Sequence, residues 1–297
     1  RKERSEEAKK QEKAEISNAR FFFLFSEHYC KMYRNQIWRT FVMNYQIAED
    51  AKPQISLLLW ATVASVALAG ISWFFPILSY LVYPLQLFAT FVHEGSHVLA
   101  AVLTGSPVLS LTVSPDTSGV VWSAANGWLA QLLISSAGYL GTIAFGTILL
   151  VWMRYGFSSR IGLYISAGFV GIMTLVFGLV FPILNIFSAN VTFGSVAFTV
   201  LSGLVLTSGL FAIAKFADLK WANFALAFLS VQCLLNAFFS LKDLFIISAT
   251  TTAQSDAVNM ANATGIPSIL WVFIWIGISV LMIGVGLRIY AVSQRAK

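Results

Sequence analysis

Two histidines and a glutamate, His93, Glu94 and His97, lie within five residues of one another in an otherwise uncharged apolar run, residues 84–105. Histidines four residues apart share one face of a helix, where both imidazoles can bind one Zn²⁺. The glutamate that follows the first histidine can then take a proton from a water on the metal. Ionisable groups are costly inside a membrane and usually mark function there. The spacing therefore predicts a metal site in a membrane helix.

Two histidines leave such a site incomplete, because catalytic zinc usually has three protein ligands and a water. The one other histidine of the chain, His28, lies outside the apolar part of the sequence. A carboxylate is the natural candidate, and Asp243 near the end of an apolar segment is the first choice. Asn236 lies seven residues before it and shares its helix face, where it can orient the ligand or hold a substrate backbone. Asp256, in a predicted flexible loop, is the alternative.

The composition predicts a polytopic membrane protein. Of 297 residues, 58% are hydrophobic and only 11% are charged, against about 25% charged residues in soluble domains. The mean hydropathy is +0.76. The net charge of +6 suits a membrane surface better than nucleic acid. The two cysteines, Cys30 and Cys233, are far apart and indicate neither a disulfide framework nor a cysteine metal site.

Seven apolar stretches approach or exceed the roughly 20 residues that cross a bilayer. They cover approximately residues 54–75, 77–104, 127–153, 161–184, 191–214, 221–248 and 268–290. A segment between the second and third stretches alternates valine and leucine with polar residues around a Pro-Asp-Thr-Ser-Gly turn, which predicts a short β-hairpin. We therefore expect an all-α integral membrane fold of about six to seven transmembrane helices, with a hairpin after the histidine helix.

The chain is expected to divide at its charge boundary. Residues 1–52 are mixed-charge at first and then interleave aromatic with basic residues, which is typical of an interfacial or partner-binding amphipathic extension. Residues 53–297 form the predicted membrane domain.

Loop charge gives an orientation for the later helices. Basic residues flank the loops near 154–160 and 215–220 and end the chain, whereas the loops at 185–190 and 249–267 contain none. Because basic loops stay inside, this alternation predicts four consecutive crossings from residue 127 onward. It places the segment 105–126 on the uncharged side.

Further strings of the sequence carry a family resemblance. They are His93 to Leu99, Leu103-Thr104-Gly105, Ser114-Pro115-Asp116-Thr117-Ser118-Gly119, Ala137-Gly138-Tyr139-Leu140-Gly141, Asp243-Leu244 and Ser255-Asp256-Ala257. With the histidine motif in an apolar helix, they make the chain resemble the site-2-protease class of intramembrane zinc metallopeptidases, and within it a predicted peptidase branch. The similar region is roughly residues 84–275.

The resemblance implies roles for four residues: His93 and His97 as zinc ligands, Glu94 as general base and Asp243 as third ligand. One departure is visible, because the stretch from Asn236 to Asp243 lacks the proline and glycine usual in the class. The resemblance also implies a site open to the cytosolic side, whereas the loop charges favour the other side.

The leading hypothesis is a multi-pass membrane zinc protease that hydrolyses peptide bonds of membrane-embedded substrates with a metal-activated water. Its expected partners are membrane lipid and a transmembrane protein substrate. The alternative is a catalytically silent, protease-like scaffold that serves as an assembly subunit of a larger membrane complex. A transporter is less favoured, because no inverted repeat is visible.

Overall fold

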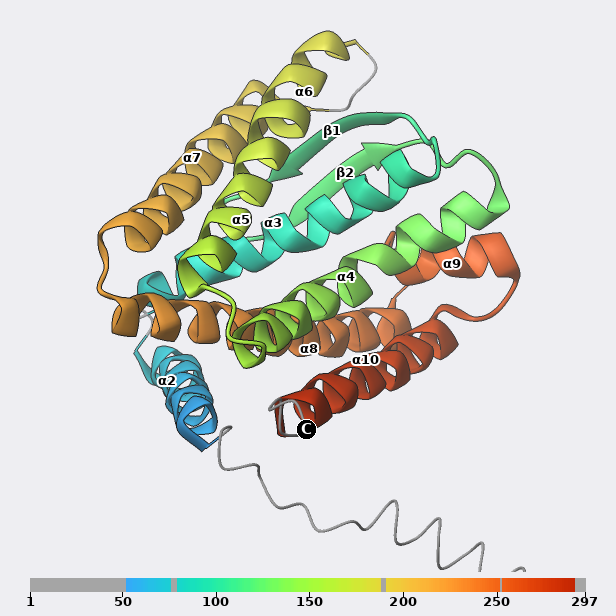
Figure 1. The fold of residues 1–297 in the computed structure, drawn as a ribbon. Coiled ribbons are helices and arrows are strands. Elements are labelled where there is room, and N and C mark those ends of the chain that lie inside the picture. Colours follow the sequence, from blue (N-terminus) through green and yellow to red (C-terminus); the bar gives the residue numbers. More distant parts are fainter. Residues whose placement is uncertain (1–51, 76–78, 188–190, 252, 292–297) are drawn as a thin grey trace, which may run out of the picture. The chain divides into compact units, whose positions relative to one another are not determined.

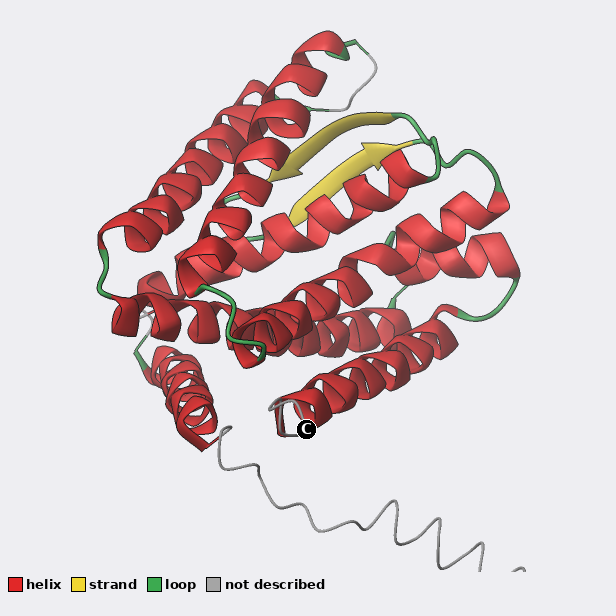
Figure 2. Ribbon diagram, in the orientation of Figure 1, coloured by secondary structure: helices red, strands yellow, loops and turns green. Residues whose placement is uncertain are grey.

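Long apolar helices build most of the protein (Figure 1 and Figure 2). The computed structural model describes residues 52–75, 79–187, 191–251 and 253–291. The helices are α2 (Lys52–Phe74), α3 (Ser79–Leu103), α4 (Trp128–Arg154), α5 (Ser159–Ile172), α6 (Phe181–Leu184), α7 (Phe193–Phe216), α8 (Leu219–Thr250), α9 (Asp256–Thr264) and α10 (Ser268–Ala291). The predicted extension, residues 1–52, lies outside the described residues except for its last one.

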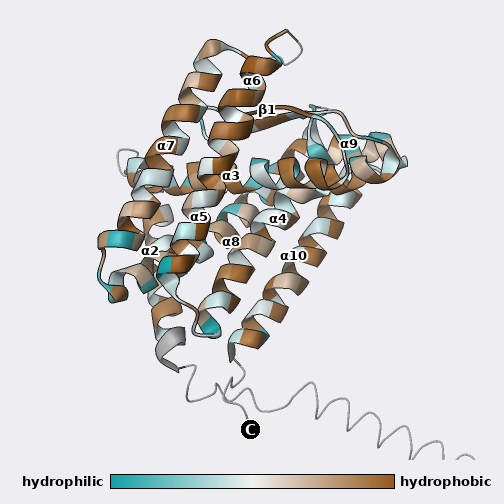
Figure 3. Cartoon of the chain, turned by 45° about the horizontal axis from the view of Figure 1, so that its top comes forward, coloured by the Kyte–Doolittle hydropathy of each residue, from teal (hydrophilic) through white to brown (hydrophobic). Residues whose placement is uncertain are grey.

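Five helices of the described chain are long and apolar enough to cross a membrane. They are Trp128–Arg154, Ser159–Leu184, Phe193–Phe216, Leu219–Thr250 and Ser268–Ala291. A shorter apolar stretch, Ile55–Leu68, lies in α2. Hydrophobic residues cover the long helices, and hydrophilic ones gather at helix ends and around α9 (Figure 3). The protein is a multi-pass integral membrane protein, and the number of spans is close to the six to seven predicted.

The second span changes its helical winding midway. A π-helical segment, η3 (Met173–Val180), connects α5 to α6, so the chain from Ser159 to Leu184 is one continuous helix. At Gly178 an added Cβ would lie 2.9 Å from Thr199 Cγ2 and 3.7 Å from the Leu111 carbonyl oxygen. The missing side chain therefore lets this span approach both α7 and the sheet closely.

The predicted β-hairpin is present. Strand β1 (Val108–Val113) pairs antiparallel with β2 (Gly119–Ser123), with a register irregularity near the start of β1. The turn is closed by Asp116, whose Oδ1 accepts hydrogen bonds from the Ser118 N–H at 3.0 Å and the Ser118 hydroxyl at 2.6 Å. These two bonds hold the pKa of the Asp116 carboxyl below its usual value.

The hairpin runs back along α3 rather than away from it. The Tyr83 hydroxyl, in the first turns of α3, donates to the Pro115 carbonyl at 2.7 Å. Two turns further on, the Thr90 hydroxyl donates to the Thr117 carbonyl at 2.6 Å. The turn of the hairpin is therefore fastened to the N-terminal half of α3, and β2 passes along the histidine-bearing part of that helix.

Helix α4 is the central element of the bundle, because it packs against α3, α8 and α10. Small residues allow these close contacts. Ser230 on α8 donates its hydroxyl to the Gly146 carbonyl at 2.7 Å, where an added Cβ would meet the Ser230 carbonyl oxygen at 3.0 Å. On the α10 side, Trp275 Nε1–H donates to Ser136 Oγ at 3.1 Å. The helix that faces the motif is thus held on both sides.

Candidate metal centre

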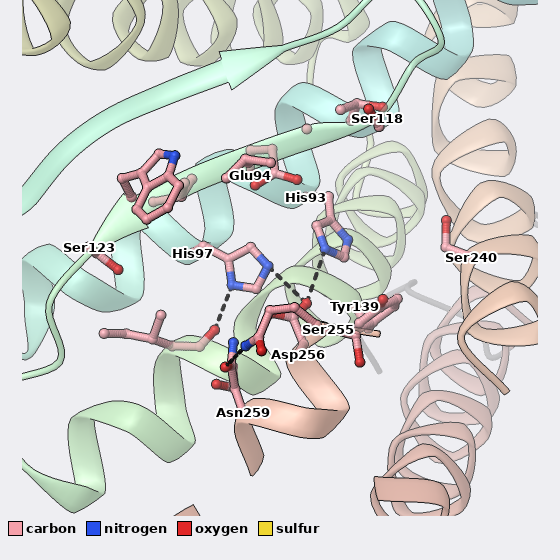
Figure 4. Close-up of a pocket in the computed structure, with 18 of the residues that line it drawn as sticks. His93, Glu94, His97, Ser118, Ser123, Tyr139, Ser240, Ser255, Asp256 and Asn259 are labelled. Carbon is pink, nitrogen blue, oxygen red and sulfur yellow. Dashed lines mark hydrogen bonds and ion pairs between the residues drawn. The ribbon is translucent and has the colours of Figure 1, made fainter. Parts of the chain in front are cut away.

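The two motif histidines face a carboxylate from a distant part of the chain (Figure 4). His93 Nε2 lies 3.7 Å from Asp256 Oδ2, and His97 Nε2 lies 3.3 Å from the same oxygen. One ligand atom from each residue lies within 4.8 Å of the other two. As the helical spacing predicted, both imidazoles project from one face of α3. Together with Asp256 they offer two nitrogens and one oxygen to a single cation.

The backbone of α4 sets the tautomer of His97. His97 Nδ1–H donates to the Ile134 carbonyl oxygen at 2.6 Å, and His97 is buried, with 6% of its surface exposed. Because Nδ1 keeps its proton in this bond, Nε2, which faces Asp256, is the nitrogen that would give up its proton to bind a metal. Metal-binding histidines are usually oriented by such a bond from the other ring nitrogen. His97 is therefore arranged as a ligand.

Aromatic contacts orient His93. Its ring lies 4.9 Å from the His97 ring and 4.6 Å from the Tyr139 ring, centroid to centroid, with the Tyr139 ring nearly perpendicular at 85°. Tyr139 in turn stacks on Trp275 of α10, with centroids 5.3 Å apart and an interplanar angle of 24°. No role was expected for Tyr139 from sequence, although this residue lies in the Ala137–Gly141 string that carries the resemblance.

A glycine of α4 forms the floor beneath the imidazoles. A Cβ added at Gly138 would lie 2.2 Å from His93 Nε2 and 2.4 Å from His97 Nε2, which no side chain can tolerate. One turn on, a Cβ at Gly141 would lie 2.3 Å from Ser96 Oγ. The small residues of α4 are a packing face, and this face packs directly against the ligand atoms.

Asp256 is the first residue of α9, a short helix between α8 and α10. Ser255 precedes it, and its hydroxyl accepts the Val258 N–H at 3.3 Å. Trp128 Nε1–H donates to the Ala263 carbonyl at 2.9 Å near the other end of α9. Burial raises the pKa of Asp256, but the charge of His97 and hydrogen bonds from both imidazoles hold the pKa well below its usual range. The carboxylate is therefore ionised, as a metal ligand must be.

The structure places Asp243, the first choice of third ligand from sequence, away from the two histidines. Its carboxylate is 62% exposed and forms an ion pair with Lys242 at 2.9 Å, outside the cluster formed by the histidines and Asp256. Asp243 shares a helix face with Asn236, which does line the pocket. At 1.5 Å per residue, Asp243 lies about 10 Å beyond Asn236 along α8, and it is not among the residues that line the pocket. The alternative, Asp256, occupies the position expected for the third ligand.

Glu94 lies in the same pocket as the cluster. The pocket has a volume of about 600 Å³ and is lined from α3, β2, α4, α8 and α9. Glu94 is only 6% exposed. Strand β2 confines it, because a Cβ added at Gly119 would lie 2.4 Å from Glu94 Cγ and 2.6 Å from Oε1. A buried carboxylate beside a cation site can accept a proton from a water in this pocket.

Comparison with known protein families identifies the family of this chain. The model described as "Peptidase M50B-like" matches residues 61–286, which include every element of the site. The chain belongs to the M50B-like peptidase family. Neither the comparison with curated proteins nor that with solved structures found a match.

The residues present fit the zinc ion that M50-type metallopeptidases use. Two imidazole nitrogens and one carboxylate oxygen form a donor set common in catalytic zinc sites, which keep a fourth position for water. The Nδ1–H bond of His97 and the absent Gly138 side chain leave both Nε2 atoms accessible to an ion. In this member of the M50B-like peptidase family, the motif residues named by the resemblance thus lie in one pocket, with Asp256 rather than Asp243 beside the histidines.

Proposed function

We propose that the protein is an intramembrane zinc metallopeptidase that hydrolyses peptide bonds of membrane-embedded substrates. The observation that carries this proposal is the meeting of His93, His97 and Asp256 around one point, with buried Glu94 lining the same pocket. A purely structural site would not need a buried carboxylate beside the ligand set, because such a group is costly to bury.

Each residue has a task in this reaction. His93, His97 and Asp256 would hold Zn²⁺, which when bound would supply acidification of a water and polarisation of the peptide carbonyl. Glu94 would take a proton from the water in the pocket that attacks the peptide carbonyl and pass this proton to the departing amine nitrogen. The narrow space between Gly119 and Glu94 fixes the direction in which the carboxylate points. Burial of Glu94 limits competing contacts with bulk water.

The hairpin offers a place where an extended substrate can bind. The outer edge of β1 is occupied, because the Val113 N–H donates to Thr199 Oγ1 at 2.8 Å and the Asn185 side chain donates to the Leu109 carbonyl at 3.5 Å. The outer edge of β2 borders the pocket. Substrate can pair with this strand by backbone hydrogen bonds, which would carry its peptide bond past Glu94.

Replacement of Glu94 by glutamine tests the proposal. The assay uses quenched fluorescent casein, an unfolded chain that can pair with a strand edge, and the purified protein in detergent with and without zinc. E94Q should retain zinc and lose cleavage, since glutamine cannot take the proton. The matched control is D243N, which removes an exposed carboxylate outside the cluster and should cleave normally. Equal cleavage by E94Q and the unmodified protein would refute the role.

The scaffold hypothesis predicts a different result. A catalytically silent subunit would show no zinc-dependent cleavage in any variant, and its removal would disturb a larger membrane complex. The ordered ligand set and the open pocket of about 600 Å³ support hydrolysis over this alternative.

A further inference from the structure

The charges of the described chain are separated between the two ends of the helical bundle. One end comprises the start of α2, the α4–α5 and α7–α8 loops and the end of α10. The other end carries the start of α4, the α6–α7 loop and α9 (Figure 1). The first end carries the basic residues Lys52, Arg154, Arg160, Lys215, Lys220 and Arg288, with Asp218 as its acidic residue.

At the opposite end the described basic residue is Lys242, and its ion pair with Asp243 cancels its charge. Because loops rich in lysine and arginine remain on the side from which a membrane protein is inserted, the end with Arg154, Arg160, Lys215 and Lys220 faces the cytosol or its organellar equivalent. The end that carries α9 faces the exoplasmic side.

The depth of the pocket can be measured along two independent helices. On α4 the pocket is lined from Gln131 to Tyr139, which lie 23 and 15 residues before Arg154, or about 35 and 23 Å at 1.5 Å per residue. On α8 it is lined by Asn236 and Ser240, which lie 16 and 20 residues after Lys220, or about 24 and 30 Å. The hydrocarbon core of a bilayer is about 30 Å thick. Both helices therefore place the pocket in the half of the membrane that is farther from the basic loops.

We propose that the pocket opens to the exoplasmic side and that its substrates are peptide segments presented at that face of the membrane. The opening of the pocket is inferred from the charge separation and from the position of the pocket along α4 and α8. The nature of the substrates rests on the proposed peptidase function. The position also explains how the buried Glu94 and the half-buried Asp256 are tolerated, because water can reach the pocket from the exoplasmic side. It is opposite to the cytosolic opening that the resemblance implied, and it extends the orientation expected from the same loop charges to the pocket.

Cysteine accessibility tests the orientation without any need for activity. Asn126→Cys and Asn262→Cys introduce exposed thiols at the pocket end, and Ser158→Cys and Asp218→Cys introduce them at the basic end. The background is Cys30→Ser, and the native Cys233 is fully buried. A membrane-impermeant maleimide is applied to intact cells or right-side-out vesicles, before and after permeabilisation.

The two pocket-end thiols should react in sealed membranes, and the two basic-end thiols only after permeabilisation. The reverse pattern would overturn the proposal, and so would labelling of both ends in sealed membranes. A double variant with E94Q serves as control and should label as its parent does, because orientation does not depend on catalysis.

A matched pair of reporters tests whether the cleaved segments lie on the exoplasmic side of the membrane. Each is a single-span membrane protein with the same unfolded casein-derived segment, placed next to the span on the exoplasmic side in one and on the cytosolic side in the other. Only the exoplasmic reporter should be cleaved, and cleavage of the cytosolic one would overturn the inference. If neither is cleaved while the labelling pattern holds, the peptidase function fails and the orientation stands.

Discussion

Gly138→Ala is the most informative single substitution in the metal centre. The new methyl group would lie 2.2 Å from His93 Nε2 and 2.4 Å from His97 Nε2, whereas ordinary contacts begin near 3.4 Å. The imidazoles or the α4 backbone must therefore move by about 1 Å. Overpacking of this kind costs about 1–3 kcal/mol of folding free energy. A displacement of about 1 Å at a reacting centre can lower the rate about 100-fold.

The expected result is a loss of zinc together with activity. We expect zinc affinity to fall by about 10- to 100-fold, the size seen when the groups that orient metal ligands are changed. Zinc content of the purified protein, measured by inductively coupled plasma mass spectrometry, and tryptophan-detected thermal unfolding in detergent would show both effects.

The matched control is Gly168→Ala, also within a helix, where an added Cβ meets nothing within 4 Å. This variant should keep zinc, and its stability should be unchanged or raised by up to about 1 kcal/mol, because alanine favours helix over glycine. Gly138→Ala with normal zinc content and stability would refute the close approach of α4 to the imidazoles.

Three further predictions separate the tasks of the site. Asp256→Asn should lose zinc while Asp243→Asn retains it, as measured by metal content; the opposite result would restore Asp243 as ligand. Gly119→Ala should retain zinc but lose cleavage, because its methyl group would displace Glu94 and no metal ligand; normal casein hydrolysis would contradict this. Removal of zinc by a chelator should lower the unfolding temperature, and added Zn²⁺ should restore it, since an ion bound only by the folded state stabilises that state; an unchanged temperature would count against a bound ion.

Local periodicity explains why part of the site could be predicted from sequence. His93 and His97 share a helix face at any site where their segment is helical, so their convergence required no knowledge of the fold. The hairpin was equally readable, because alternation and turn residues act over a few positions. Five long spans followed from apolar length alone.

The third ligand and the glycine floor depend on distances across the fold. Asp243 and Asn236 share a face, but the pocket is lined by Asn236 and Ser240 and does not extend to Asp243, about one turn further along α8. Asp256 reaches the histidines only because the chain reverses after α8 and α9 packs against α4. Gly138 was named only within the Ala137–Gly141 string of the resemblance, and sequence could not show that its neighbours are imidazoles.

The placement of Asp256 on α9 has a consequence for biogenesis. Ribosomal synthesis delivers His93 and His97 about 160 residues before this carboxylate, so a nascent chain carries only two of the three proposed ligands until α9 is made. A polypeptide truncated after α8 would lack the Asp256 carboxylate and could not complete the proposed metal site. Under the proposed function, hydrolytic competence would thus arise only after α9 has been synthesised.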